Sequence, residues 1–261
     1  MRIAVTGARG QVGRECVALG AEPIVEDILE LERVEADVVI HCAAFTDVDG
    51  CELDEARAMR VNAEGTQRLV DSTDAFVVYV STDYVFDGTK PDAYVESDPT
   101  NPISAYGRSK LAGELAIDPE RGAIVRTSWV VGRYGRNMVK TIVRLLGGDG
   151  PLRFVKDQRG HPTVAADLAT TLMHIGREHL SGTWHVTNQG AVSWYEFAQG
   201  VAIASGHDPN RIEPITTSEL QPPRPAPRPA NSVLDTERLP RAAWLPDWRE
   251  SLPGVLADLR E

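Results

Sequence analysis

Short apolar runs alternate with stretches of helical spacing over the first half of the chain. The apolar runs lie at residues 2–6, 36–44, 75–81 and 121–128, and the stretches with helical spacing lie at 11–19, 54–72 and 103–114. Runs of this length without alternating polar positions are typical of strands buried on both faces. Strand and helix in regular alternation predict an α/β fold with a Rossmann-type doubly wound parallel sheet.

The second half of the chain has a less regular pattern. Helices are predicted at residues 137–146, 167–178 and 193–205, while residues 221–229 contain too many prolines for a helix or a central strand. By composition alone, this proline-rich segment is a linker or a polyproline II docking segment. We expect residues 1–130 to form the sheet domain. Residues 131–261 should form mainly a smaller C-terminal lobe, interleaved with the first domain through returning segments near 152–175 and 211–216.

The composition is that of an ordinary globular protein, with 42% hydrophobic and 25% charged residues. The net charge of −11 is spread along the chain without a basic block, which argues against a nucleic acid as partner. No run approaches about 18 apolar residues, so no membrane span is expected, and the first residues enter a strand pattern rather than a signal peptide. Three cysteines without metal-ligand spacing predict reduced thiols in the cytoplasm and no metal site.

A glycine-rich turn joins the first predicted strand to the first predicted helix. Gly7, Gly10 and Gly13 stand in the spacing GxxGxxG rather than GxGxxG. Glycines in such a turn allow close approach of the backbone to a pyrophosphate at the helix N-terminus. Since the turn lies between strand and helix at the start of the chain, we predict an NAD(P)-binding domain over residues 1–130.

The sequence leaves the choice between NAD and NADP open. An acidic residue after the second strand would bind the ribose 2′-hydroxyl of NAD, and Glu22, Glu26 and Asp27 are candidates for that position. Arg9, inside the glycine turn, is a candidate for a 2′-phosphate, although a solvated loop arginine is an equally good interpretation. The second strand and the segment after it are unusually short, so the register of these residues is uncertain.

Tyr106 and Lys110 are four residues apart in a predicted helix, so they share one face and can reach the same bound molecule. A nearby cation stabilises a phenolate, which would make the tyrosine a better proton relay. Such a pair also occurs by chance on solvated helices. Here, however, a buried strand ends nearby in the sequence at Thr82, whose hydroxyl is expected to point into the same crevice.

Several sequence blocks in one order resemble the extended short-chain dehydrogenase/reductase family. They are the glycine turn and the residues at 42–46, 81–88 and 106–110. Within that family, further blocks at 126–130, 157–163 and 228–235 make the chain similar to the dTDP-4-dehydrorhamnose reductases. The resemblance runs nearly from end to end. The main departure is the shortened region 21–35, which leaves the adenosine ribose pocket and the cofactor preference open.

The resemblance implies an NAD(P)H-dependent reduction of the C4 keto group of a dTDP-4-keto-6-deoxyhexose. The expected substrate is dTDP-4-dehydro-L-rhamnose, reduced to dTDP-L-rhamnose. Tyr106 would donate a proton to the carbonyl oxygen, and Lys110 would lower the pKa of Tyr106 and bind the nicotinamide ribose. Thr82 would hydrogen-bond the same carbonyl group.

The resemblance also implies two sets of binding residues. The cofactor set is Gly7, Arg9, Gly10, Gln11, Val12, Asp27, Ile28, Cys42, Ala43 and Ala44, with Tyr106 and Lys110. The substrate set is Thr46, Val48, Thr82, Asp83, Tyr84, Trp129 and Arg228. Trp129 would pack on the deoxysugar, the alternative being an ordinary core tryptophan. Arg228 or Arg224 would lie near the diphosphate, the alternative being a solvated loop.

Other activities stay open at this point. In nucleotide-sugar 4,6-dehydratases the threonine is followed by Asp-Glu, whereas here it is followed by Asp83 and Tyr84, which disfavours dehydration. A 4-ketoreductase of different stereochemistry or an epimerase is the nearer alternative. A non-catalytic relative, like the regulatory β-subunit of methionine adenosyltransferase, would not need the set of Thr82, Tyr106 and Lys110. Whether the chain is a monomer or a homodimer is likewise open.

Overall fold

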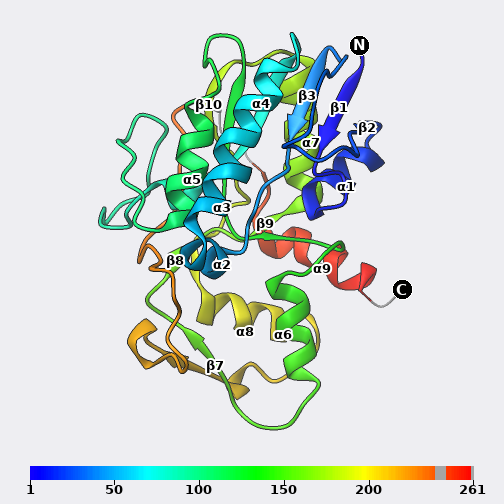
Figure 1. Ribbon diagram of the computed structural model, residues 1–261. Coiled ribbons are helices and arrows are strands. Elements are labelled where there is room, and N and C mark those ends of the chain that lie inside the picture. The colour runs from blue at the N-terminus through cyan, green and yellow to red at the C-terminus, as the bar shows by residue number, and fades with distance from the viewer. Residues whose placement is uncertain (239–244, 260–261) are drawn as a thin grey trace.

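Six parallel strands form the central sheet, which occupies the upper part of the view in Figure 1. The computed structural model describes residues 1–238 and 245–259. The strands are β1 (Ile3–Thr6), β2 (Glu22–Pro23), β3 (Val38–His41), β4 (Phe76–Thr82), β5 (Ala123–Thr127) and β10 (Gly182–His185). Their order is β10-β5-β4-β3-β1-β2, and neighbouring strands are parallel throughout. The predicted doubly wound parallel sheet is confirmed.

The strand order reverses between β1 and β3, since β2 lies on one side of β1 and the later strands lie on the other. In open parallel sheets, a crevice forms outside the carboxyl ends of the strands at such a reversal. The region between β2 and β3 is short and adds no further strand to the sheet. This accounts for the compressed pattern seen in the sequence at residues 21–35.

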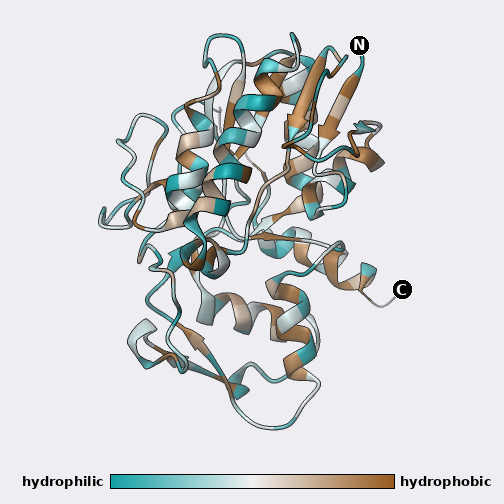
Figure 2. Cartoon of the chain, viewed as in Figure 1, coloured by the Kyte–Doolittle hydropathy of each residue, from teal (hydrophilic) through white to brown (hydrophobic). Residues whose placement is uncertain are grey.

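Alternate strand residues face the two sides of the sheet, and each side has its own core. On one side, residues such as Ile3, Val5 and Val38 pack under helices α1 (Gln11–Ala18) and α7 (Ala165–Arg177). On the other side, Ala4, Val39 and Val77 belong to a second cluster with Leu69 of helix α4. The strands β1 and β3 are therefore mainly apolar and end in a polar residue, and they are largely brown in Figure 2.

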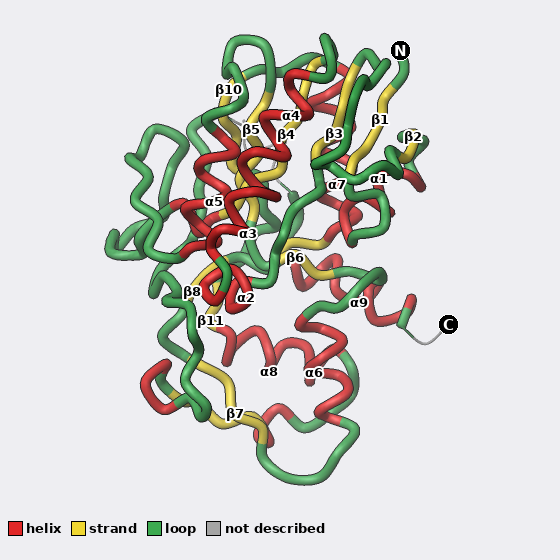
Figure 3. The backbone as a smooth tube through the Cα atoms, viewed as in Figure 1, coloured by secondary structure: helices red, strands yellow, loops and turns green. Residues whose placement is uncertain are grey.

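The second side of the sheet is covered by helices α4 (Gly65–Asp71) and α5 (Ala105–Glu114). The predicted helix 54–72 consists of α3 (Glu55–Met59), a π-helical turn at Arg60–Glu64, and α4. Figure 3 shows these helices in red beside the yellow strands. A π-helical turn inside a helix often marks a functional site.

A smaller lobe lies below the sheet in Figure 1 and has its own apolar cluster. Its main elements are α6 (Met138–Leu146), β7 (Leu152–Val155), α8 (Trp194–Ala204), β12 (Ile212–Ile215) and α9 (Trp248–Asp258). The short elements of the chain are α2 (Val48–Leu53), β6 (Val130–Val131), β8 (Arg159–Gly160), β9 (Thr163–Val164) and β11 (Val192–Ser193). Three 3-10 turns lie at Asp83–Val85, Pro209–Arg211 and Thr217–Glu219.

One expectation about the returning segments is wrong. Residues 211–216 do not return a strand to the main sheet, because β12 pairs in parallel with β7 in a separate two-stranded sheet. Glu213 and Pro214 of β12 are exposed, which fits a small peripheral sheet and not a strand buried on both faces. The segments that return are α7, which covers the main sheet, and β10, which forms its edge beside β5. The division into two domains at residue 130 stays a prediction.

Within the described ranges, 1–238 and 245–259, no helix is long and apolar enough to cross a lipid bilayer.

Candidate active site

A cavity of about 1000 Å³ opens at the carboxyl ends of β1, β3, β4 and β5. It is lined by the glycine turn, by the residues after β3 and β4, and by residues 127–130 after β5. Every residue of the expected cofactor set lines this cavity, and so does every residue of the expected substrate set except Arg228. The fold thus brings residues from Gly7 to Trp129 to one edge of the sheet; their contacts with a ligand stay predictions.

The glycine turn is shaped for close backbone packing. Gly7 has φ of +64°, and a Cβ there would lie 2.6 Å from the backbone nitrogen of Ala43. A Cβ on Gly13 would overlap the carbonyl oxygen of Gly7. Gly10 caps helix α1 without a side chain, so the first N–H groups of the helix have no side-chain partner at this end. Such N–H groups at a helix N-terminus favour a phosphate, and the cradle fits the pyrophosphate of a dinucleotide.

Both acidic and basic groups line the part of the cavity next to β2. The Asp27 carboxylate accepts a hydrogen bond of 2.9 Å from the backbone N–H of Leu29, so it also shapes the turn after β2. Four arginines line the same cavity: Arg9 from the glycine turn, Arg57 from α3, Arg60 from the π-helical turn and Arg136 before α6. Arg57 and Arg60 are not in the expected cofactor set, because neither belongs to a recognisable sequence motif.

Tyr106 is placed by the start of helix α5. The Ser104 hydroxyl caps this helix by accepting a hydrogen bond of 3.1 Å from the N–H of Gly107. Burial raises the pKa of the Tyr106 phenol well above its ordinary range, a hydrogen bond with Thr82 acts in the opposite direction, and the charge of Asp83 raises the pKa further. The phenol is therefore protonated at neutral pH, which is the state required of a proton donor.

Lys110 lies on the same face of α5 and is 2% exposed. Its ammonium donates a hydrogen bond of 2.8 Å to the carbonyl oxygen of Val80 and lies 4.0 Å from the ring centroid of Tyr79. Burial lowers the pKa of Lys110 to about 7, against the opposing charge of Glu114. Burial is the largest effect on the Tyr106 pKa and raises it, and the expected lowering of that pKa by Lys110 stays a prediction.

Thr82 and Asp83 stand where β4 ends. The Thr82 hydroxyl donates a hydrogen bond of 3.0 Å to Oδ1 of Asp83, and the backbone N–H of Tyr84 donates to the same hydroxyl at 3.2 Å. Asp83 is 2% exposed, and its Oδ2 has no hydrogen-bond partner among the described residues. Burial raises the pKa of Asp83 to about 7, although hydrogen bonds from Ser232 and Thr82 act to lower it.

Arg228 does not line the cavity, and both of its terminal nitrogens bind Asp49 at 3.0 Å. Arg224 of the proline-rich segment binds the same carboxylate at 3.2 Å. Burial alone would raise the pKa of Asp49, but the hydrogen bonds from Arg228 and from the backbone N–H of Ala226 lower it overall. The proline-rich segment is therefore fixed to helix α2 by an ion pair, and its predicted contact with a diphosphate stays untested.

Asn62 links the loop after β3 to helix α5, a role that its sequence context did not reveal. It lies in the π-helical turn and is 1% exposed. Its Nδ2 donates to the carbonyl oxygen of Phe45 at 3.0 Å and to the Ser109 hydroxyl at 2.9 Å, while its Oδ1 accepts from the N–H of Phe45 at 2.7 Å. All polar atoms of the amide are used, so Asn62 holds the loop after β3 against α5.

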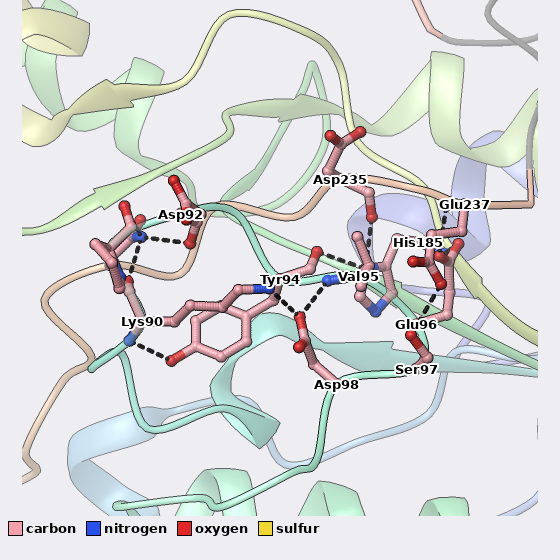
Figure 4. Close-up of polar contacts among 12 residues, drawn as sticks. Lys90, Asp92, Tyr94, Val95, Glu96, Ser97, Asp98, His185, Asp235 and Glu237 are labelled. Atoms are coloured by element: carbon pink, nitrogen blue, oxygen red, sulfur yellow. Dashed lines mark hydrogen bonds and ion pairs between the residues drawn. The ribbon is translucent and has the colours of Figure 1, made fainter.

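A polar network beside the site fixes the long loop after β4 (Figure 4). Lys90 and Asp98 form an ion pair of 2.6 Å within this loop. The backbone N–H of His185, in β10, donates to Glu96 at 3.0 Å, and the His185 ring contacts the carbonyl oxygen of Asp235 at 2.9 Å. The loop and the segment around Asp235 are thus both attached to the sheet edge. Among the residues that the structure describes, no cluster of His, Cys, Asp or Glu could hold a metal ion.

Trp194, which the sequence did not single out, lines the cavity together with Trp129. The two indole rings are stacked, with centroids 3.7 Å apart and an interplanar angle of 9°. Trp194 begins helix α8 of the smaller lobe. Its position in the cavity depends on the packing of α8, which a local sequence pattern does not specify.

A dinucleotide cradle at a parallel sheet, together with a half-buried tyrosine and a buried lysine one helical turn apart, defines a short-chain dehydrogenase/reductase. Within this class, the chain belongs to the family described as the RmlD substrate binding domain, whose model matches residues 1–261.

Named relatives of the chain reduce nucleotide-linked keto sugars. A dTDP-4-dehydrorhamnose reductase from Burkholderia thailandensis is 40% identical over 99% of this chain and 99% of that protein. A probable dTDP-4,6-dihydroxy-2-methyloxan-3-one 4-ketoreductase from Streptomyces antibioticus is 38% identical over 98% of this chain and 96% of that protein. The structure of dTDP-4-dehydrorhamnose reductase from Bacillus anthracis in complex with NADP has a TM-score of 0.90 and 33% identity, with coverage of 98% of this chain and 99% of that chain.

Proposed function

We propose that the chain reduces the C4 keto group of dTDP-4-dehydro-L-rhamnose with NADPH and forms dTDP-L-rhamnose. The observation that carries this proposal is the half-buried Tyr106, which lines one cavity with Thr82, Lys110 and a glycine turn shaped for a dinucleotide. Full-length relatives with this activity in their names support the substrate, and the NADP complex of one of them supports the cofactor.

In this mechanism NADPH supplies the hydride that adds to C4. Tyr106 donates its phenolic proton to the carbonyl oxygen as negative charge develops there. The Thr82 hydroxyl hydrogen-bonds the same oxygen and orients the ketone. A positioned acid of this kind contributes about 10²–10⁴ in rate.

Lys110 and the glycine turn position the cofactor. Lys110 lies one helical turn beyond Tyr106, and its ammonium donates a hydrogen bond to the Val80 carbonyl oxygen. We propose that the same ammonium binds the nicotinamide ribose. The N-terminus of α1 and the cradle at Gly7 and Gly13 would hold the pyrophosphate. Arg9, Arg57 and Arg60 are the cations in the cavity that would meet the 2′-phosphate of NADPH.

A second candidate is the same reduction on another dTDP-linked keto sugar. The Streptomyces relative is nearly as similar to this chain as the Burkholderia relative, and its name specifies a different sugar. The catalytic set of Thr82, Tyr106 and Lys110 would serve either ketone, so the choice depends on the sugar-binding part of the cavity.

The test uses dTDP-4-dehydro-L-rhamnose (dTDP-4-keto-6-deoxy-L-mannose) prepared in situ. Oxidation of NADPH and, separately, of NADH is monitored by absorbance. The proposal expects consumption of NADPH and a product identified by NMR as dTDP-L-rhamnose. No consumption with either cofactor would contradict it, and consumption of NADPH only with another dTDP-linked keto sugar would favour the second candidate.

We propose a cytoplasmic location, because the proposed reaction uses NADPH and a nucleotide sugar, which are cytoplasmic metabolites. The assembly state, monomer or homodimer, stays a prediction.

A further inference from the structure

Arg136 lines the cavity and comes from the loop between β6 and α6, where the chain enters the smaller lobe. Its side chain is exposed, and it has no hydrogen-bond or ion-pair partner among the residues that the structure describes. The guanidinium therefore does not hold the loop in place. Its N–H donors are free for water or for a ligand in the cavity.

The loop that carries Arg136 is fixed to helix α1 on both sides of this residue. Before it, Arg133 donates hydrogen bonds of 3.0 and 2.8 Å to the carboxylate of Glu15, which is buried in α1. After it, Nδ2 of Asn137 donates to Oε1 of Gln11 at 3.1 Å. Gln11 is the first residue of α1. The backbone at Arg136 is thus held beside the helix N-terminus at which the glycine turn forms its cradle.

The charge of the cavity lining differs in sign from that of the whole chain. The chain has a net charge of −11, but among the described residues the lining has five basic side chains against three acidic ones. The basic residues are Arg9, Arg57, Arg60, Lys110 and Arg136, and the acidic residues are Glu26, Asp27 and Asp83. An excess of basic groups inside an acidic protein favours an anionic ligand.

Arg136 enters the cavity from a different side than the other arginines. Among the described lining residues, it is the only basic one that follows β5, whereas Arg9 belongs to the glycine turn and Arg60 to the π-helical turn. The adenosine ribose is expected near Asp27, which follows β2, and three strands separate β2 from β5 in the sheet. The 2′-phosphate of NADPH is therefore expected away from Arg136.

We propose that Arg136 is a diphosphate-binding residue: from the lobe side of the glycine turn, its guanidinium binds the diphosphate of a nucleotide in the cavity. A guanidinium suits this group because it carries a fixed charge and donates parallel hydrogen bonds to neighbouring phosphate oxygens. Both nucleotides of the proposed reaction, the dinucleotide and the dTDP-linked sugar, contain a diphosphate. The inference rests on the proposed function for the identity of these nucleotides.

The test is a fluorescence titration of the native chain and its variants with NADPH, NADH and dTDP. We expect Arg136→Met to weaken the binding of a diphosphate ligand about tenfold to 100-fold, because it removes charged hydrogen bonds to phosphate. Arg136→Lys should recover part of the loss, since lysine keeps the charge but not the planar set of donors. Arg144→Met is the control: it removes the same charge from an exposed position in the last turn of α6, outside the cavity lining, and should leave every affinity unchanged.

The three ligands separate the possible sources of the phosphate. Equal losses for NADPH and NADH in Arg136→Met would assign Arg136 to the pyrophosphate of the dinucleotide, and a loss for dTDP would assign it to the diphosphate of the substrate. A loss for NADPH alone would place Arg136 at the 2′-phosphate and overturn the proposal, as would unchanged affinities for all three ligands. A native chain that binds none of the three ligands would refute the proposed function together with this inference.

Discussion

Asp83→Asn removes a carboxyl group that the fold favours in its protonated form. Asp83 is 2% exposed, and one of its oxygens has no hydrogen-bond partner among the described residues. Burial therefore raises its pKa from 3.8 to about 7, despite hydrogen bonds from Ser232 and Thr82. Asn has nearly the same shape and cannot ionise, so the substitution isolates the effect of the charge.

The sign and size of the effect are set by linkage between protonation and folding. A carboxyl group with a higher pKa in the folded than in the unfolded protein binds its proton more tightly in the folded state. Its contribution to stability is complete below about pH 4 and is lost as the pH rises to about 7. A separation of about three pKa units corresponds to about 4 kcal/mol. As the pH rises through this interval, the free energy of unfolding of Asp83→Asn should therefore increase relative to that of the native chain, by up to about 4 kcal/mol.

Urea unfolding of both proteins, monitored by tryptophan fluorescence between about pH 4 and pH 8, measures this difference. The buried His41 and His161, whose pKa values burial lowers to about 3 and about 4, titrate in both proteins and cancel in the comparison. Asp74→Asn is the control, since the Asp74 side chain is 94% exposed and its substitution should give a difference that does not change with pH. A pH-independent difference for Asp83→Asn would refute the reasoning.

Gly13→Ala should weaken NADPH binding about 100-fold or more, because the new Cβ overlaps the Gly7 carbonyl oxygen and displaces the cradle. A fluorescence titration measures this, with Gly254→Ala, where the added Cβ meets open space, as the control; equal affinities would contradict it. Arg126→Met should lower the free energy of unfolding by about 3–5 kcal/mol, because it leaves the buried Glu114 carboxylate unpaired. Urea unfolding measures this, with Arg153→Met as the control because Arg153 forms an exposed ion pair with Glu213. If Arg126→Met lowers the free energy of unfolding no more than Arg153→Met does, the prediction is contradicted.

The strands and their common edge were predictable because they depend on local patterns. Residues 36–44 and 75–81 are apolar on both faces, which only a covered parallel strand accommodates. Because the strands are parallel, their carboxyl ends lie at the same edge of the sheet. Gly7, Ala43 and Thr82, which follow or end three of these strands, therefore line one cavity. The expected substrate and cofactor residues, except Arg228, line one cavity for this reason.

The features that the sequence did not reveal depend on packing between distant segments. Trp194 reaches the cavity only because α8 of the lobe packs beneath it, and Arg60 reaches it through a π-helical turn. The strand at 212–215 was expected in the wrong sheet, since a four-residue strand does not specify its partner. Arg228 forms an ion pair with Asp49 and does not line the cavity, so its expected contact with the substrate stays a prediction.

The pKa of Tyr106 also depends on burial, which a local sequence pattern does not specify. A lysine one turn away predicts a lowered pKa when its charge is considered without the burial of the phenol. In the folded chain, burial dominates for both groups: it raises the pKa of Tyr106 and lowers that of Lys110 to about 7. A protonated phenol is the form that the proposed ketone reduction requires of Tyr106.

The measurement that tests the central claim most directly is the turnover of Tyr106→Phe with the keto sugar nucleotide, together with its affinity for NADPH. Phe keeps the ring that packs edge-on against Tyr84, at 5.8 Å between centroids, and removes the phenolic proton alone. The account predicts a fall in kcat of about 10²–10⁴ with nearly unchanged NADPH affinity. Full turnover in Tyr106→Phe would contradict the assignment of Tyr106 as the proton donor.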